Sequence, residues 1–302
     1  MVSIRWAVGV FSIVCVTTVL VLLRSSEAAI RTRHGTLEAA EISHQLFGER
    51  RLEHARLRSS SGLEVEIAIL YPVAEPLQRR PLVVLLGGLR TGRDAVELID
   101  DSPDVVVAAL SYPYHGSRKF SPWKLPQTLF HVRRASIDTP AALILALDFL
   151  LDQPGIDPEH VELVGVSAGS PFVCVAGALD ERFHRIWAVH GGAGAFQMIG
   201  HILKGEVPNP LLRWSATTTA WLLTTSISPE RFVDRIAPRP FVMISARDDE
   251  AIPRASTDLL FDSAREPKEI IWMAGGHVQG GRGEQIAAIV DIVFDRMVEN
   301  PL

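Results

Sequence analysis

The residues best suited to covalent chemistry lie in a Gly-x-Ser-x-Gly pattern at positions 165–169. A mainly apolar run precedes this pattern, and a segment with helical periodicity follows it. A serine thrust forward on a sharp strand-to-helix turn has a strained backbone and needs neighbours without bulky side chains, which Gly165 and Gly169 provide. The free N–H groups of the following helix favour negative charge at the same place. Ser167 is therefore a candidate nucleophile, and the Ala168 N–H is a candidate oxyanion donor.

The rest of the chain alternates short apolar runs with helical segments, which predicts the α/β class, with a mostly parallel central sheet flanked by helices. Buried parallel strands are expected at residues 82–86, 105–110, 161–166, 185–190, 240–245 and 269–273. Helices are expected at residues 139–152, 169–179, 254–264 and 283–299. Residues 63–71 alternate apolar and polar side chains and predict a half-exposed antiparallel strand. The polar residues 31–61 predict a helix followed by an edge strand.

One apolar segment, at about residues 193–235, contains no buried strand. We expect it to form a small helical cap inserted between two strands of the sheet. Ordinary packing helices and a substrate-gating lid are both compatible with this composition.

Together these features resemble the α/β-hydrolase superfamily of serine hydrolases, from about residue 63 to the C-terminus. Residues 228–240, Ser-Pro-Glu-Arg-Phe-Val-Asp-Arg-Ile-Ala-Pro-Arg-Pro, look like the segment before the catalytic acid in dienelactone-hydrolase and acetyl-esterase-like relatives. The resemblance implies an α/β-hydrolase fold and the chain order nucleophile, acid, histidine.

The resemblance also implies where the acid and the base lie. Family members place the acid shortly after a strand and a few residues before a proline, which favours Asp249, with Asp248 as the alternative. We expect Glu250 to be a solvated loop charge. His277 follows two glycines after the last strand, where the family places its general base.

The second oxyanion donor is expected in the loop after the strand at residues 82–86. Relatives often have His-Gly in this loop, and Leu86 stands where that histidine would be. The N–H group of Gly88 or Leu89 is the candidate donor, and a simple tight turn is the alternative. His190 ends another strand and could border the site, but it is expected to be a satisfied core histidine. His115 lies in a loop that could line the pocket, and it is expected to be structural and not catalytic.

The N-terminus has the composition of a membrane-targeting segment. An uncharged run at residues 6–23 lies between Arg5 and Arg24. Its length favours an uncleaved signal anchor over a signal peptide, although cleavage after Ala28 is compatible with the sequence. We therefore expect residues 1–28 to be this segment and residues 29–302 to be the hydrolase domain, membrane-anchored or secreted, with the catalytic part outside the cytoplasm.

Composition excludes several other classes of protein. The formal net charge is −5 and no basic stripe is visible, so nucleic acid is not an expected partner. Of the two cysteines, Cys15 lies in the apolar N-terminal run and Cys174 in a predicted helix far from it, so a disulfide framework is excluded. No Cys/His cluster has zinc-ligand spacing, and we expect neither a metal nor another cofactor.

These observations predict a carboxylesterase that acts on small esters through a Ser-His-Asp triad. A thioesterase, a lipase-like enzyme or a prolyl-oligopeptidase-type peptidase would use the same residues. A non-catalytic, membrane-tethered scaffold of the same fold is the alternative from another class.

Overall fold

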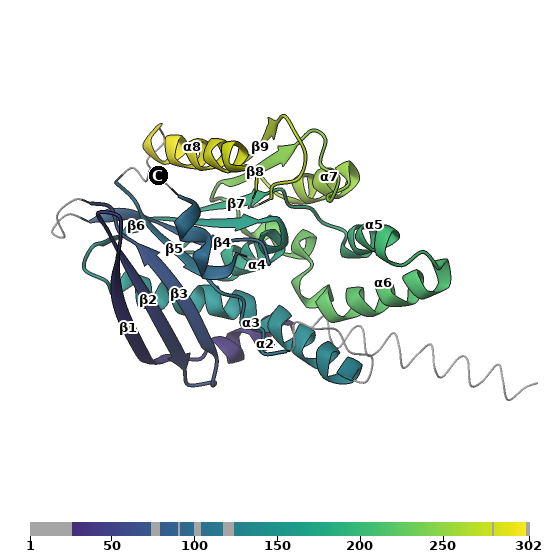
Figure 1. The fold of residues 1–302 in the computed structure, drawn as a ribbon, viewed down its shortest axis with the longest axis horizontal. Coiled ribbons are helices and arrows are strands. Elements are labelled where there is room, and N and C mark those ends of the chain that lie inside the picture. The colour runs from purple at the N-terminus through teal and green to yellow at the C-terminus, as the bar shows by residue number, and fades with distance from the viewer. Residues whose placement is uncertain are drawn as a thin grey trace, which may run out of the picture.

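The apolar runs of the sequence form one nine-stranded sheet in the computed structural model. The structure describes residues 26–73, 79–89, 91–99, 104–116, 124–279 and 281–299. The strands follow the order β1-β2-β3-β5-β4-β6-β7-β8-β9 (Figure 1). Their bounds are β1 Leu37–Phe47, β2 Arg50–Ser59, β3 Glu64–Leu70, β4 Arg80–Leu86, β5 Val106–Leu110, β6 Ile156–Val166, β7 Arg185–Val189, β8 Phe241–Ala246 and β9 Lys268–Met273.

Strand direction divides this sheet into two parts. The first strands, β1, β2 and β3, pair antiparallel, and β3 joins β5 antiparallel as well. From β5 through β4, β6, β7 and β8 to β9 every pairing is parallel. The mostly parallel sheet predicted from the sequence is thus confirmed, and so is the antiparallel strand near residues 63–71. In the parallel part, all carboxyl ends meet at one edge, where open α/β sheets bind their ligands.

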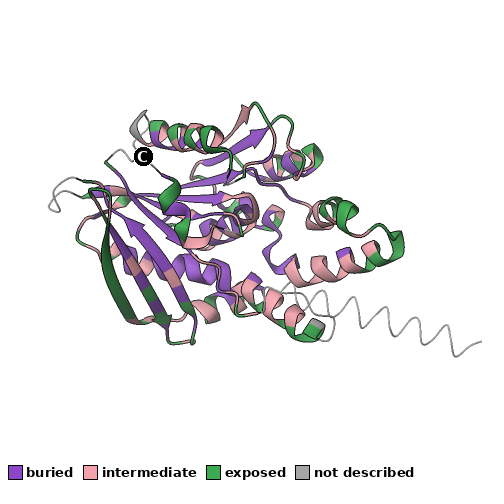
Figure 2. Ribbon diagram, viewed as in Figure 1, coloured by how far each residue is buried: buried purple, intermediate pink, exposed green. Residues whose placement is uncertain are grey.

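Helices cover both faces of the sheet, which explains the continuous apolar runs. One face packs against α2 Ser26–His34, α3 Leu125–Leu151 and α4 Ser170–Leu179. The other face packs against the 3₁₀ helix η1 Gly92–Leu98 and α8 Gly283–Glu299. Figure 2 shows most of the parallel part buried between these layers, whereas the last strand, β9, is only half-buried.

The segment between β7 and β8 is helical, as the sequence indicated. It contains α5 Ala195–Glu206 and α6 Pro210–Thr224, followed by short 3₁₀ turns that end at Arg235. Figure 1 shows α5 and α6 side by side, projecting beyond the sheet. The next helix, α7 Arg254–Ser263, returns to the body of the domain between β8 and β9.

Two expectations about elements were incomplete. Residues 31–61 form two strands, β1 and β2, instead of a single edge strand. Nearly all of β1 is exposed, with Leu46 at 78% exposure, so no burial pattern in its sequence marks it as a strand (Figure 2). The helix expected at residues 139–152 begins earlier, at Leu125, and Pro140 lies inside it. Its more polar first half was not recognised from the sequence.

Residues 1–25 of the expected membrane-targeting segment lie outside the residues that the structure describes. Residues 26–28 already belong to the first turn of α2, so the boundary expected at residue 28 falls inside a helix. Among the helices that the structure describes, none is both long enough and apolar enough to cross a bilayer.

Helix α2 is fastened to the domain by a buried residue and an ion pair. Ile30 is fully buried, and the Arg33 guanidinium donates to both oxygens of the buried Asp138 carboxylate in α3, at 2.6 and 3.1 Å. Arg31, also on α2, pairs on the surface with Glu27, at 3.1 Å.

We therefore predict that Arg33→Ala lowers the free energy of unfolding by about 2–4 kcal/mol, because it leaves the buried Asp138 carboxylate with weaker compensation. The matched variant Arg31→Ala removes a surface pair and should change it by at most about 0.5 kcal/mol. Urea unfolding followed by circular dichroism measures both. Equal effects of the two variants would show that α2 is not docked through Arg33.

Candidate active site

Ser167 stands at the carboxyl end of β6 in a conformation that few non-glycine residues adopt. Its φ is +54°, in the left-handed region. The turn is possible because the two flanking glycines lack side chains. A Cβ atom on Gly165 would collide with Val173, and one on Gly169 would collide with the Leu86 carbonyl oxygen. This strained turn directs the Ser167 hydroxyl away from the strand, above the start of α4.

The imidazole of His277 reaches this hydroxyl from the loop after β9. The Nε2 atom of the imidazole lies 2.7 Å from Ser167 Oγ, and His277 as a whole is only 9% exposed. The loop is held on both sides of the residue, because the His277 N–H donates to Glu250 Oε2 at 2.8 Å and its carbonyl accepts from Arg282 at 2.9 Å. Glu250 is thus more than the solvated loop charge expected from the sequence, and the bond from the His277 N–H lowers the pKa of its carboxyl group.

Asp249, in the turn after β8, lies on the other side of the imidazole. Its Oδ2 and Oδ1 are 2.9 and 3.0 Å from His277 Nδ1. Oδ1 also accepts the N–H groups of Ala251 and Ile252 at 2.9 and 2.8 Å. An ionised carboxylate can only accept, so His277 Nδ1 carries the proton and Nε2 presents its lone pair to the Ser167 hydroxyl.

Of the two candidate acids, the structure brings only one to the histidine. Asp248 is exposed to solvent, and its backbone N–H is bonded to the Gly275 carbonyl oxygen at 3.2 Å. The adjacent Asp249 faces inward because its carboxylate caps the turn that leads to Pro253 and α7.

A second imidazole contacts the same carboxylate. His190, at the end of β7, is 1% exposed and has a φ of +48°. Its Nδ1 lies 3.0 Å from Asp249 Oδ2, and its ring meets the His277 ring edge to face at 5.4 Å between centroids. The Val278 N–H is 3.4 Å from the same nitrogen, too far to compete for it.

These contacts fix the protonation of His190. Its Nδ1 must donate, since the carboxylate cannot. Its Nε2 is buried and has no partner among the described residues, so a proton there would be left unsatisfied. The Nδ1 of His190 therefore carries a proton, which it donates to Asp249. The expectation of an ordinary core histidine overlooked this contact, although its position at the end of the strand between β6 and β8 was a usable signal.

Opposing effects set the pKa of Asp249. Burial raises it, but hydrogen bonds from His190, His277 and the Ile252 N–H together lower it well below the usual range for aspartate. The carboxylate therefore stays ionised at neutral pH. Its contribution to stability is present above the ordinary aspartate pKa and is lost as the pH falls towards the lower value of the folded state.

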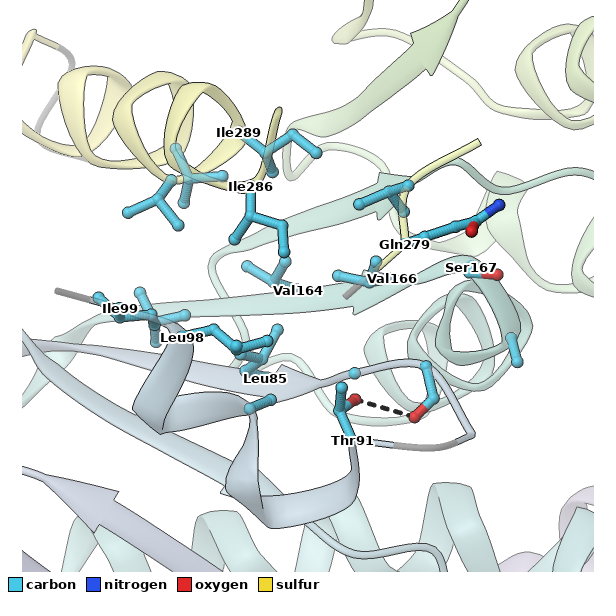
Figure 3. A pocket seen from close by; sticks show the side chains of 18 of the residues that line it. Leu85, Thr91, Leu98, Ile99, Val164, Val166, Ser167, Gln279, Ile286 and Ile289 are labelled. Atoms are coloured by element: carbon cyan, nitrogen blue, oxygen red, sulfur yellow. Dashed lines mark hydrogen bonds between the residues drawn. The ribbon is translucent and has the colours of Figure 1, made fainter. Parts of the chain in front are cut away.

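The candidate oxyanion donors border the same space as the serine. Gly88, Leu89 and Ala168 line a cavity of about 790 Å³ together with Ser167 and His277. The loop after β4 is held through its carbonyl groups, because Tyr112 Oη donates to Gly87 O at 2.7 Å and Thr91 Oγ1 to Gly88 O at 3.0 Å (Figure 3). In the part of the chain that the structure describes, neither the Gly88 nor the Leu89 N–H group has a backbone hydrogen-bond acceptor, so either could donate to an incoming oxygen. His115, by contrast, is exposed in the loop after β5.

One cluster in the described part of the chain has the composition of a metal site: His190, Asp249 and His277. Both imidazoles, however, direct Nδ1 at the carboxylate, at 2.9 and 3.0 Å. A metal ion there would have to displace both protons and break the contact between His277 and its acid. We therefore interpret the cluster as a hydrogen-bond network.

Comparisons with known proteins show the fold of the chain. No protein-family model matches it. The uncharacterized protein YfhR of Salmonella typhimurium is 26% identical over 145 residues, which are 46% of this chain and 47% of YfhR. The chain thus spans about half the length of this curated relative.

Solved structures match over much more of the chain. The acetyl xylan esterase from Paenibacillus sp. R4 has a TM-score of 0.65 at 14% identity, covering 90% of this chain and 93% of the esterase. Acetyl xylan esterase 1 from Thermoanaerobacterium has 0.58 at 11% identity, covering 88% and 92%. A cold-adapted esterase from an Arctic metagenomic library has 0.59 at 19% identity, covering 86% and 99%. The chain has the α/β-hydrolase fold.

The geometry around Asp249 makes a prediction for His190. His190→Leu keeps the approximate side-chain volume but removes the hydrogen-bond donor to Asp249. Because a hydrogen bond to a charged group is lost, we expect kcat to fall about 10-fold and KM to change less than about twofold. His190→Asn places an amide N–H near the position of Nδ1 and should retain most of kcat. Steady-state kinetics on a soluble ester measures both. Equal losses in the two variants would mean that His190 acts only through packing.

Proposed function

We propose that this protein is a serine hydrolase that cleaves a carboxylic ester through a covalent acyl-enzyme on Ser167. One observation carries the proposal: a continuous hydrogen-bond chain joins Ser167 Oγ to His277 Nε2 at 2.7 Å and His277 Nδ1 to Asp249 at 2.9 Å. A nucleophile, a base and a carboxylate that orients the base are the groups that acyl transfer requires.

In the first half of the reaction, Ser167 Oγ attacks the ester carbonyl carbon while His277 Nε2 takes the hydroxyl proton. The charge on the resulting imidazolium is stabilised by the Asp249 carboxylate. The negative oxygen of the tetrahedral intermediate meets the N–H of Ala168 and that of Gly88 or Leu89. Collapse of the intermediate expels the alcohol, which receives the proton from Nε2.

In the second half, His277 takes a proton from water, and the oxygen of that water attacks the acyl carbon. Collapse of this second intermediate releases the carboxylic acid and returns the proton to Ser167 Oγ. No other reactant is needed, because water supplies both the nucleophile and the proton.

The choice of ester rests on supporting observations. Several solved structures of the same fold are named as esterases, including two acetyl xylan esterases. A thioesterase, a lipase-like enzyme or a prolyl-oligopeptidase-type peptidase would use the same three side chains, because specificity depends on the pocket. The intact hydrogen-bond chain weighs against a scaffold that has lost turnover.

We predict that a fluorophosphonate probe labels the purified protein at Ser167. Ser167→Ala should abolish labelling, and His277→Ala should slow it at least 100-fold, because the hydroxyl loses its base. Intact-protein mass spectrometry and peptide mapping measure the adduct. A well-folded protein that stays unlabelled would contradict the proposal.

Neighbouring aspartates offer a matched test of the acid. Asp249→Asn should lower kcat about 10³- to 10⁴-fold, because an amide at that position favours the wrong tautomer of His277. Asp248→Asn changes a solvent-exposed side chain and should leave kcat within about twofold. Ester kinetics on both variants measures the difference, and comparable losses would show that Asp249 is not the acid.

A further inference from the structure

We infer that the natural substrate of this site carries an apolar acyl chain of about six carbons or more, and that this chain lies in a groove on the sheet face beneath α8. The inference rests on the proposed function, because it concerns the acyl group that Ser167 would hold. It also departs from the expectation of a small acyl group.

The groove is the inner part of the 790 Å³ cavity, and β4, β6, η1 and α8 form it. Its floor is made by Leu85 of β4 with Val164 and Val166 of β6 (Figure 3). On one side lie Leu98 of η1 and Ile99, which follows it, and on the other lies α8, with Ile286 and Ile289.

The groove borders the described part of the connection from β4 to β5. Its described helix, η1, has only seven residues, which span about 14 Å at the rise of a 3₁₀ helix. The parallel strands on this face are apolar, and Leu85 and Val166, which line the cavity, are only partly buried. Pockets of several hundred Å³ with predominantly apolar walls are typical of small-molecule sites.

The groove begins at the reacting atoms. Val166 directly precedes Ser167. Val164 lies two residues before Val166, about 7 Å further along the strand, and points to the same face. The candidate oxyanion donors Gly88 and Ala168 line the same cavity. When an acyl carbon is bonded to Ser167 Oγ and its carbonyl oxygen faces these donors, the rest of the acyl chain can therefore extend into the groove.

The chemistry of the lining selects the kind of chain. Among the described residues that line the cavity none is Asp, Glu, Lys or Arg, and apart from Ser167 and His277 their polar side chains are those of Thr91 and Gln279. The hydroxyl of Thr91 is already bonded to the Gly88 carbonyl oxygen. A sugar or a charged acyl group would lose its bonds to water here without replacement, whereas methylene groups lose none. An acetyl group would leave the groove empty.

The experiment measures kcat/KM for p-nitrophenyl esters with acyl chains from two to ten carbons. Full burial favours binding about fourfold per methylene group, and the groove is partly open. We therefore expect kcat/KM to rise at least about 50-fold from acetate to octanoate. Val164→Phe fills the floor and should lower kcat/KM for octanoate at least 10-fold, while acetate stays within about threefold.

Two further variants keep the result interpretable. Ile286→Trp narrows the groove from α8 and should act like Val164→Phe, which guards against a folding defect in the strand variant. The matched control is Ile202→Trp on α5, where Ile202 is 53% exposed and does not line the groove. It should leave the whole chain-length profile unchanged.

Three results would overturn the inference. The first is a preference for acetate in a protein whose Ser167 reacts with a fluorophosphonate, which would leave the proposed function intact. The second is a chain-length profile that responds to Ile202→Trp and not to the groove variants, which would place the chain near α5. The third is faster turnover of acetates of long-chain alcohols than of octanoates, which would show that the groove binds the alcohol part of the ester and not the acyl chain. An unlabelled, inactive protein would instead refute the proposed function itself.

Discussion

The site depends on one buried carboxylate that two imidazoles share. Asp249 accepts from His277 and His190 through its side-chain oxygens, and from the backbone N–H groups of Ala251 and Ile252. This saturation keeps the carboxylate ionised despite its burial, since each donor stabilises the negative charge. An ionised Asp249 in turn fixes the tautomer of His277, which leaves Nε2 free to face the Ser167 hydroxyl.

Sheet topology makes this arrangement possible. The strands β6, β7, β8 and β9 are adjacent and parallel, so the residues that follow them meet at one edge. Ser167 follows β6, His190 follows β7, Asp249 follows β8 and His277 follows β9. Each neighbouring strand therefore contributes one member of the network. The opposite faces of the sheet differ, because long helices close one of them while η1 and α8 leave an apolar groove on the other.

The sequence predicted those features that depend on local pattern. The buried strands and the Gly-x-Ser-x-Gly turn could be recognised because burial on both faces and a turn without side chains each leave a signature over a few residues. Exposed elements left none, which is why β1 and the first half of α3 were missed. The choice between Asp248 and Asp249 and the role of His190 depend on the direction of single side chains. Such directions follow from packing between strands far apart in the chain, which one sequence does not display.

The most direct test of this account is a crystal structure of the protein after reaction with an octyl-bearing alkyl fluorophosphonate. We expect phosphorus bonded to Ser167 Oγ, the phosphoryl oxygen within hydrogen-bond distance of the Ala168 N–H, and His277 still bridged to Asp249. The octyl chain should lie between Val164 and α8. A phosphorus atom attached elsewhere, or a His277 imidazole turned away from both Ser167 and Asp249, would contradict the account.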